Sequence, residues 1–260
     1  MLRPLFRRVV RGAVRQSVGL SLEEQIAAMF GSSDGFWLDP SDPSTVFQDA
    51  AGTIPAKPGD PVGLILDKSG NGTHLSHRTA TSRPILRQSG GYTYLESDGV
   101  DDVLVGDLRE PAAGIFMAIT FARRSSNSGL DVLSNLDTAI STNTTGQSYL
   151  SMNSYAFRAH DQNYFMGYDT PNVGEPIVAE GGWSPSLGQG YSADGGQIKN
   201  TANGVKVGDN RKISVCARSN GFNPSDIEVY GALVICKDPE QIDREIAREW
   251  LAQKAGVTLP

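Results

Sequence analysis

The feature that most constrains the fold is a series of short apolar runs between Gly35 and Ile235, each bounded by Gly, Asn, Asp, Ser or Pro. The clearest runs are residues 62–66, 92–95, 103–105, 115–121, 149–152, 177–179, 213–217 and 227–236. Short runs between turn residues are typical of strands, and they favour an antiparallel sandwich or barrel over βαβ units. Residues 181–208 are rich in Gly, Ser and Asn, so we expect mainly loops there.

The first residues have a different pattern, that of a basic amphipathic helix. Apolar residues recur at helical spacing, and arginines occupy the other faces. Such a helix can lie on an anionic membrane, contact nucleic acid, dock on a partner or pack on its own domain or on copies of itself. We favour docking or self-association, through an anchoring arm that includes Leu5, Phe6, Arg7, Arg8, Val9, Arg11 and Arg15.

Two further helices are indicated by capping signals. Ser21 with Glu24 forms a capping box for a short helix that Gly31 ends. Near the C-terminus, Asp238 followed by Pro239 predicts the start of a helix over residues 239–255, which Gly256 ends.

Composition excludes some classes of protein. The net charge of −6 and the pI near 5.1 argue against nucleic acid as the main partner of the 260-residue chain. Charges interrupt the N-terminal apolar residues, so we expect neither a signal peptide nor a transmembrane segment, and folding in a cytoplasm. Cys216 and Cys236 leave a disulfide between neighbouring strands open, and two free thiols are favoured.

Aspartate, asparagine and glycine are concentrated in two segments, residues 98–102 and residues 67–72. Asp98, Asp101 and Asp102, with Asn71, offer oxygen ligands of the kind that Ca²⁺ prefers. Asp and Asn also favour turns, because their side chains bond to nearby backbone groups. The spacing does not match a helix-loop-helix calcium site, so we favour the turn interpretation and expect no cofactor.

No catalytic set assembles from the sequence. Glycosidases need two carboxylates across a cleft, and Glu175, Glu180 and Glu228 are the loosest candidates. The histidines are His74, His77 and His160, and neither a G-x-S-x-G elbow nor a phosphate-binding glycine loop is present. We therefore expect a protein that is not an enzyme.

Aromatic residues in polar segments are candidates for ligand contact. Trp183, Tyr191 and Tyr168, with Asn223, lie among Gly, Asn and Asp. Rigid rings beside amide groups suit carbohydrate or protein surfaces, although half-buried loop anchors explain them equally well.

Several segments together resemble a family of tailed-phage and prophage virion proteins. The motifs are Phe36-Trp37-Leu38-Asp39-Pro40-Ser41-Asp42, Val46-Phe47-Gln48-Asp49, Leu66-Asp67-Lys68-Ser69-Gly70-Asn71-Gly72, Leu95 to Asp102, Val229 to Val234 and Glu249 to Leu259. The resemblance covers residues 36–110 and 211–260, and it carries no catalytic residues. Ser97 replaces the family's usual Phe, so we expect looser packing there.

The resemblance implies a concanavalin A-like (laminin G-like) jelly roll in a tail fibre, baseplate or capsid decoration, often one that binds host-surface glycans. We accordingly predict an arm (residues 1–34) that attaches the protein to other virion proteins, and a two-sheet jelly roll (35–260) closed by the C-terminal helix. The protein would be a homo-oligomer, with a trimer favoured, made in the host bacterial cytoplasm and localised to the virion. A purely structural decoration protein and a polysaccharide depolymerase remain the alternatives.

Overall fold

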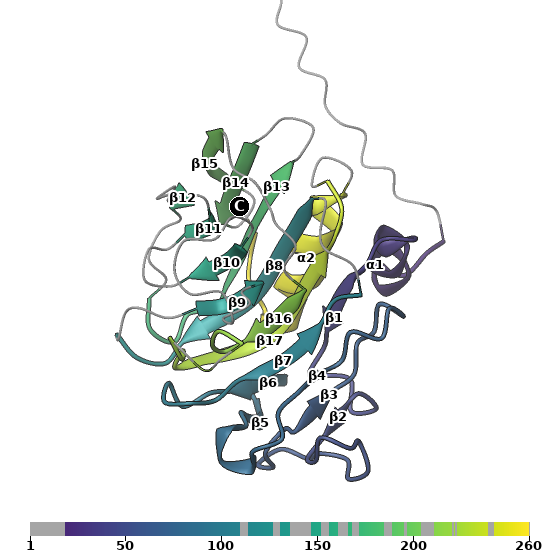
Figure 1. Cartoon of the computed structure of the whole chain (residues 1–260), viewed down its shortest axis with the longest axis vertical. Coiled ribbons are helices and arrows are strands. Elements are labelled where there is room, and N and C mark those ends of the chain that lie inside the picture. Colours follow the sequence, from purple (N-terminus) through teal and green to yellow (C-terminus); the bar gives the residue numbers. More distant parts are fainter. Residues whose placement is uncertain are drawn as a thin grey trace, which may run out of the picture.

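The chain is mostly β and forms two antiparallel sheets packed as a sandwich, as seen in a computed structural model (Figure 1). The structure describes residues 19–109, 114–126, 131–135, 147–151, 156–160, 166–167, 172–184, 189–194, 197–203, 211–219, 221, 223–238 and 242–259. Residues 1–18, which contain the residues named for the predicted anchoring arm, lie outside the described part of the chain. None of the described helices is long and apolar enough to cross a membrane.

The two sheets differ in what covers them. The helix-covered sheet contains, in spatial order, β15 (Gln197–Asn203), β14 (Gln189–Asp194), β13 (Ile177–Ser184), β8 (Ile115–Arg123), β17 (Ile227–Ile235), β6 (Tyr92–Glu96) and β5 (Ile85–Ser89), with β1 (Gly35–Leu38) also paired to β17. The second sheet contains β12 (Met166–Gly167), β11 (Ala156–His160), β10 (Gln147–Ser151), β9 (Asp131–Asn135), β16 (Lys212–Val215), β7 (Leu104–Asp107), β4 (Leu75–Ser76), β3 (Leu64–Ile65) and β2 (Val46–Phe47). A 3₁₀ turn, η1 (Ala80–Ser82), connects β4 to β5.

The prediction of loops over residues 181–208 is wrong. β13 extends to Ser184, and β14 and β15 fall entirely inside this segment. Their small polar residues still pair along the sheet, because strand pairing uses backbone N–H and C=O groups that every such residue supplies.

The main core fills the space between the sheets. Met117, Ile119 and Phe121 of β8 face Ile213 and other apolar residues of the second sheet in one buried cluster. The opposite face of β8 is also buried, since Phe116 and Ala118 belong to a separate cluster beneath the helices. β8 is therefore a central strand covered on both faces, which explains its continuous apolar sequence.

A β-bulge keeps β17 in phase with both clusters. Ile227 and Val229 face the inter-sheet core, and Ala232 and Val234 face it further along. The change from odd to even positions occurs at the register shift between Val229 and Gly231. One extra residue there lets both halves of the strand present their apolar side chains to the same core.

Two helices cover the outer face of this sheet (Figure 1). α1 (Leu22–Phe30) has the predicted capping box of Ser21 and Glu24, and it buries Ile26 and Phe30. α2 (Arg244–Ala255) ends as predicted at Gly256, which adopts the left-handed conformation.

The predicted start of the C-terminal helix at 239 is wrong. α2 begins at Arg244, and Asp243 rather than Asp238 is the N-cap, since its side chain accepts the Ile246 N–H. Ile242 lies just before the cap and joins the buried cluster of Ala247, an arrangement that fixes the entry of the chain into the helix.

Ser97 does not simply leave a gap at the position where the family that these motifs resemble has Phe. It is fully buried, and its Oγ donates to the Ser225 carbonyl at 2.5 Å and accepts the Ile227 N–H at 3.2 Å. A hydrogen-bonded connection between the end of β6 and the start of β17 takes the place of apolar packing. Cys216 and Cys236 are free thiols, as favoured.

Gly231 is needed where α2 crosses β17. A Cβ there would lie 3.1 Å from two ring atoms of Trp250, which is almost fully buried. We predict that Gly231→Val lowers the free energy of unfolding by about 2–3 kcal/mol, because the added methyl groups overlap the indole.

Chemical denaturation measures this cost, with exposed Gln88→Ala as the control. In the Trp250→Phe background the smaller ring leaves room, so the cost of the valine should fall. An unchanged cost in that background would contradict the explanation.

Candidate functional site

Three segments that are far apart in sequence meet at the edge of the helix-covered sheet. Trp37 and Asp39 lie at the end of β1, Lys68 follows β3, and Trp250 and Lys254 come from α2. These residues belong to the first, third and last motifs of the resemblance described above. The motifs therefore describe one place in the fold, which we call the Asp39 cluster: Trp37, Asp39, Lys68, Trp250 and Lys254.

A buried carboxylate is at the centre of this cluster. Asp39 Oδ2 is 2.8 Å from Lys254 Nζ and 3.0 Å from Lys68 Nζ, and Oδ1 accepts the Ser41 hydroxyl at 2.6 Å. Burial raises the pKa of Asp39, but the hydrogen bonds from Lys254, Ser41 and Lys68 outweigh it, so the pKa lies below its ordinary value. Asp39 is thus ionised at neutral pH.

The two tryptophans cover the lysine side chains. Trp37 and Trp250 pack edge to face, with ring centroids 5.5 Å apart and an interplanar angle of 82°. Lys68 Nζ is 5.0 Å from the centroid of the Trp37 ring, and Lys254 Nζ is 4.8 Å from that of Trp250. Each ammonium group therefore has both a carboxylate partner and a ring face.

Residues 66–72 hold the backbone of this cluster in place. The Asp67 carboxylate accepts backbone N–H groups from Trp37 at 2.9 Å, Ser69 at 2.8 Å and Gly72 at 2.9 Å. The next residue, Lys68, donates its own N–H to the Trp37 carbonyl at 3.0 Å. The Asp67 carboxylate therefore holds a turn that positions Trp37 and Lys68, in line with the turn interpretation of this motif.

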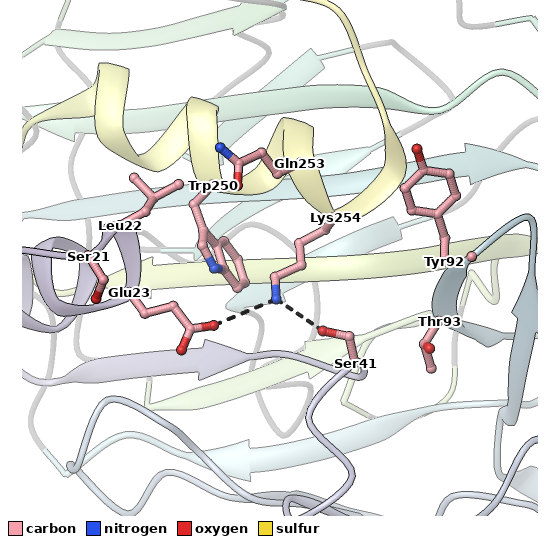
Figure 2. Close-up of a pocket in the computed structure, with 10 residues that line it drawn as sticks. Ser21, Leu22, Glu23, Ser41, Tyr92, Thr93, Trp250, Gln253 and Lys254 are labelled. Atoms are coloured by element: carbon pink, nitrogen blue, oxygen red, sulfur yellow. Dashed lines mark hydrogen bonds and ion pairs between the residues drawn. The ribbon is translucent and has the colours of Figure 1, made fainter.

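A surface pocket of about 350 Å³ opens beside the Asp39 cluster (Figure 2). Its walls come from the start of α1, the loop after β1, the start of β6 and the last turns of α2. It is lined by Ser21, Leu22, Glu23, Ser41, Gly91, Tyr92, Thr93, Trp250, Gln253 and Lys254. In Figure 2 the Lys254 side chain extends between Glu23 and Ser41, with Tyr92 on the far side of the pocket.

The sequence did not single out these pocket residues. Trp250 and Lys254 appear in a helix whose periodicity indicates only packing, and Tyr92 opens an ordinary strand. The signal that could have found the cluster is the charged residues inside the resemblance motifs, namely Asp39, Lys68 and Lys254. Opposite charges in separate motifs are expected to pair where those motifs contact one another in the fold.

The predicted metal candidates do lie together. One carboxylate oxygen from each of Asp98, Asp101 and Asp102 falls within 4.8 Å of the others. Asp102 accepts the Asp98 N–H at 3.0 Å, Asp98 accepts the Val100 N–H at 2.8 Å, and Asp101 accepts the Ser82 hydroxyl at 2.8 Å. Asn71, by contrast, bonds to Ser33 and Arg109. The aspartates are engaged in holding the turn after β6.

Burial separates Asp102 from its neighbours. It raises the pKa of Asp102 to about 6, and the nearby charges of Asp98 and Asp101 add to the effect. Gly99 in the same turn has a φ of +73°, and a Cβ there would lie 2.9 Å from the Asp226 Cβ. The turn is thus closed tightly on the chain before β17.

The predicted ligand-contact residues are not brought to the pocket as far as the structure describes them. Trp183 and Tyr191 lie on the paired strands β13 and β14, with their side chains outside the described part, as is all of Tyr168. Asn223 is half-buried, donates to Asp131 Oδ2 at 3.4 Å and accepts the Asp131 N–H, so it holds the start of β9.

The candidate catalytic glutamates are dispersed. Glu175 is exposed and accepts from Asn172. Glu180 is buried on β13 with Arg248 Nη1 at 3.1 Å, and burial raises its pKa despite the two nearby arginines. Glu228 accepts the Tyr230 hydroxyl at 2.6 Å. Of the histidines, His74 accepts the Asp67 N–H and His77 lies by the Thr79 carbonyl, both as parts of turns.

Comparison with known proteins supports the architecture. No protein-family model matches the sequence, and no curated protein matches it either. A GH54 α-L-arabinofuranosidase soaked with a cyclic sulfate inhibitor is similar over 78% of this chain and 52% of its own, with TM-score 0.53 and 12% identity. The likeness shows a shared fold.

A second similar structure is Trypanosoma rangeli sialidase in complex with 2,3-difluorosialic acid. It is similar over 89% of this chain and 37% of its own, with TM-score 0.52 and 12% identity. The chain thus spans about half of the arabinofuranosidase and less of the sialidase.

These comparisons correct the expectation of a protein that is not an enzyme. Both similar structures are glycosidases, so the fold is one that occurs in enzymes. The absence of a catalytic motif from the sequence does not exclude such an enzyme. A glycosidase needs only two carboxylates at a suitable separation, and it needs no contiguous motif.

We predict that Asp39→Asn lowers the free energy of unfolding at pH 7 by about 2–3 kcal/mol, because it leaves two largely buried ammonium groups without their shared anion. The pKa of Asp39 is lowered by folding, so its contribution is complete above about pH 4 and is lost as the pH falls through the folded-state value. Denaturation from pH 2 to pH 7 measures this, with exposed Asp107→Asn as the control. An equal cost for both variants would contradict it.

For the aspartate turn, the raised pKa of Asp102 has the opposite sign. The folded protein takes up a proton near pH 6 and the unfolded chain does so near pH 4, so protonation of Asp102 adds stability as the pH falls from about 7 to about 4. Asp102→Asn should remove this component, as measured by urea denaturation.

Added Ca²⁺ should leave the urea midpoint of the unchanged chain where it is, because the three aspartates of this turn are used in its own hydrogen bonds. A clear rise of the midpoint that Asp101→Ala abolishes would show a calcium site instead.

Proposed function

We propose that this protein is a virion component of a tailed phage, and that its β-sandwich binds a host-surface saccharide in the pocket beside the Asp39 cluster. The pocket is the observation that carries the proposal. It combines a half-exposed aromatic ring, Tyr92, with hydroxyl, amide and carboxylate groups from Thr93, Gln253 and Glu23. Saccharides are bound by such mixtures, because rings contact the C–H face of a sugar and polar groups bond to its hydroxyls.

The virion assignment rests on the sequence motifs. Motifs scattered over the chain supply the residues of one buried cluster under the pocket, as expected if they are the signature of one fold and one site. We infer that the sandwich is a concanavalin A-like jelly roll of the kind that this family implies. The residues before Ser21, which begins the wall of the pocket, would anchor the domain as an oligomer, with a trimer favoured.

Glycoside cleavage in the same pocket is the second candidate function. Two carboxylates, Glu23 and Asp39, approach one ammonium group, Lys254 Nζ, at 3.9 and 2.8 Å. Glu23 is half-exposed to the pocket, and the glycosidases with a similar fold make the reaction worth testing. The purified chain should then release reducing ends from host polysaccharide, and Glu23→Gln should abolish the release.

Deleting residues 1–20 separates anchoring from binding. We predict that the truncated protein folds with an unchanged melting temperature and still binds host cells, because the deletion keeps Ser21 and Glu24, the capping box of α1, and every residue that lines the pocket. It should fail to join the particle, as measured by its amount in purified virions relative to the full chain.

Normal incorporation of the truncated protein would contradict the anchoring role. Absence of binding to host cells by the full chain would instead favour a decoration protein, whose contacts are all within the particle.

A further inference from the structure

The charges around the pocket restrict what it can bind. Among its described lining residues, Glu23 and Lys254 are charged, and the others are hydroxyl, amide, aromatic, aliphatic or glycine residues. A ligand must therefore pair with one carboxylate and one ammonium group, unless these two groups already have partners within the protein.

The ammonium group is already paired. Lys254 Nζ bonds to Asp39 at 2.8 Å and to the Ser41 hydroxyl at 3.0 Å, and it faces the Trp250 ring. Only 15% of its side chain is exposed. Two of the three hydrogens of the ammonium group are donated to Asp39 and Ser41, and Glu23 lies 3.9 Å away, so an anionic ligand would have to compete with these carboxylates.

The charges behind the pocket also oppose an anion. Glu23, Asp39 and Asp42 surround Lys68, at 3.6, 3.0 and 3.1 Å, so three carboxylates share two ammonium groups. The local excess is negative. A carboxylate on a ligand would meet this excess in a partly desolvated pocket, where charges are screened less than in bulk water.

A positively charged group on a ligand would not meet this repulsion. Its natural partner is Glu23, which lies 3.6 Å from Lys68 Nζ and 3.9 Å from Lys254 Nζ through one oxygen and leaves the other oxygen open. The charge argument therefore acts against acidic ligands and not against amino groups.

The remaining groups suit an uncharged, hydroxyl-rich molecule. Glu23 retains free acceptor capacity, because about half of its side chain is exposed and its lysine contacts use one oxygen. Thr93 and Gln253 both donate and accept. Tyr92 is 37% exposed, and its hydroxyl lies where a Cβ at Gly256 would be, so it packs closely against the end of α2.

We propose that the pocket binds a saccharide without acidic groups and discriminates against sugars that carry a carboxylate. This inference rests on the proposed saccharide-binding function and adds the class of sugar. It separates this pocket from one for sialic acid, the ligand class of the sialidase with a similar fold.

The test is calorimetric titration of the full chain with three matched sets of probes. These are neutral hexose and pentose oligosaccharides, the same backbones ending in sialic or uronic acid, and glucosamine oligosaccharides. We expect the neutral and glucosamine sets to bind and the acidic set to bind at least about tenfold more weakly. Tyr92→Ala and Glu23→Gln should each weaken neutral binding by about tenfold, the size expected for a lost ring contact or charged hydrogen bond.

Two controls keep the outcomes distinct. Ile54→Ala alters an exposed apolar residue outside the pocket lining and should leave binding unchanged. Melting temperatures should stay near that of the unchanged chain for Glu23→Gln, because about half of the Glu23 side chain is exposed and its lysine contacts, at 3.6 and 3.9 Å, are long.

Tighter binding of the acidic set, lost in Tyr92→Ala, would overturn the sugar class and leave the proposed function in place. Neutral binding that persists in both pocket variants would overturn the location. Binding of no saccharide by the full chain would overturn the proposed function itself.

Discussion

The sharing of one buried carboxylate by two lysines is the interaction on which the rest of this structure depends. Asp39 joins the end of β1, the loop after β3 and the last turn of α2, so a single anion connects three segments that are far apart in the chain. An apolar contact could join the same segments, but it would not fix their relative positions to within a hydrogen bond. A buried ion pair adds little net stability, and its value here is geometric.

This geometry extends outwards in both directions. Inwards, the lysine stems and the edge-to-face tryptophans seal the end of the helix-covered sheet, where Trp37 pairs across to Leu233 of β17. Outwards, Lys254 becomes part of the pocket wall without being available as a charge. The pocket therefore has a hydrogen-bonded floor with a net negative charge and a polar rim, an arrangement that suits hydroxyl groups and a ring contact better than an acidic group.

Part of this could be read from the sequence, and the reasons differ from element to element. β8 and β17 were evident, because strands buried on both faces must be continuously apolar, and the capping box of α1 is a local signal. β14 and β15 were missed because they are built from small polar residues whose pairing depends on a neighbouring strand. The start of α2 was misplaced because Asp238 and Asp243 are both chemically able to cap, and packing of Ile242 selects the second. The pocket was not predictable, since its walls meet only through tertiary contacts.

The distance in sequence between the walls of the pocket has a consequence for biosynthesis. Ser21 to Glu23 are made early, Tyr92 later, and Lys254 only near residue 260. The pocket therefore cannot form until Lys254 has left the ribosome, even though the residues of its other walls are made much earlier.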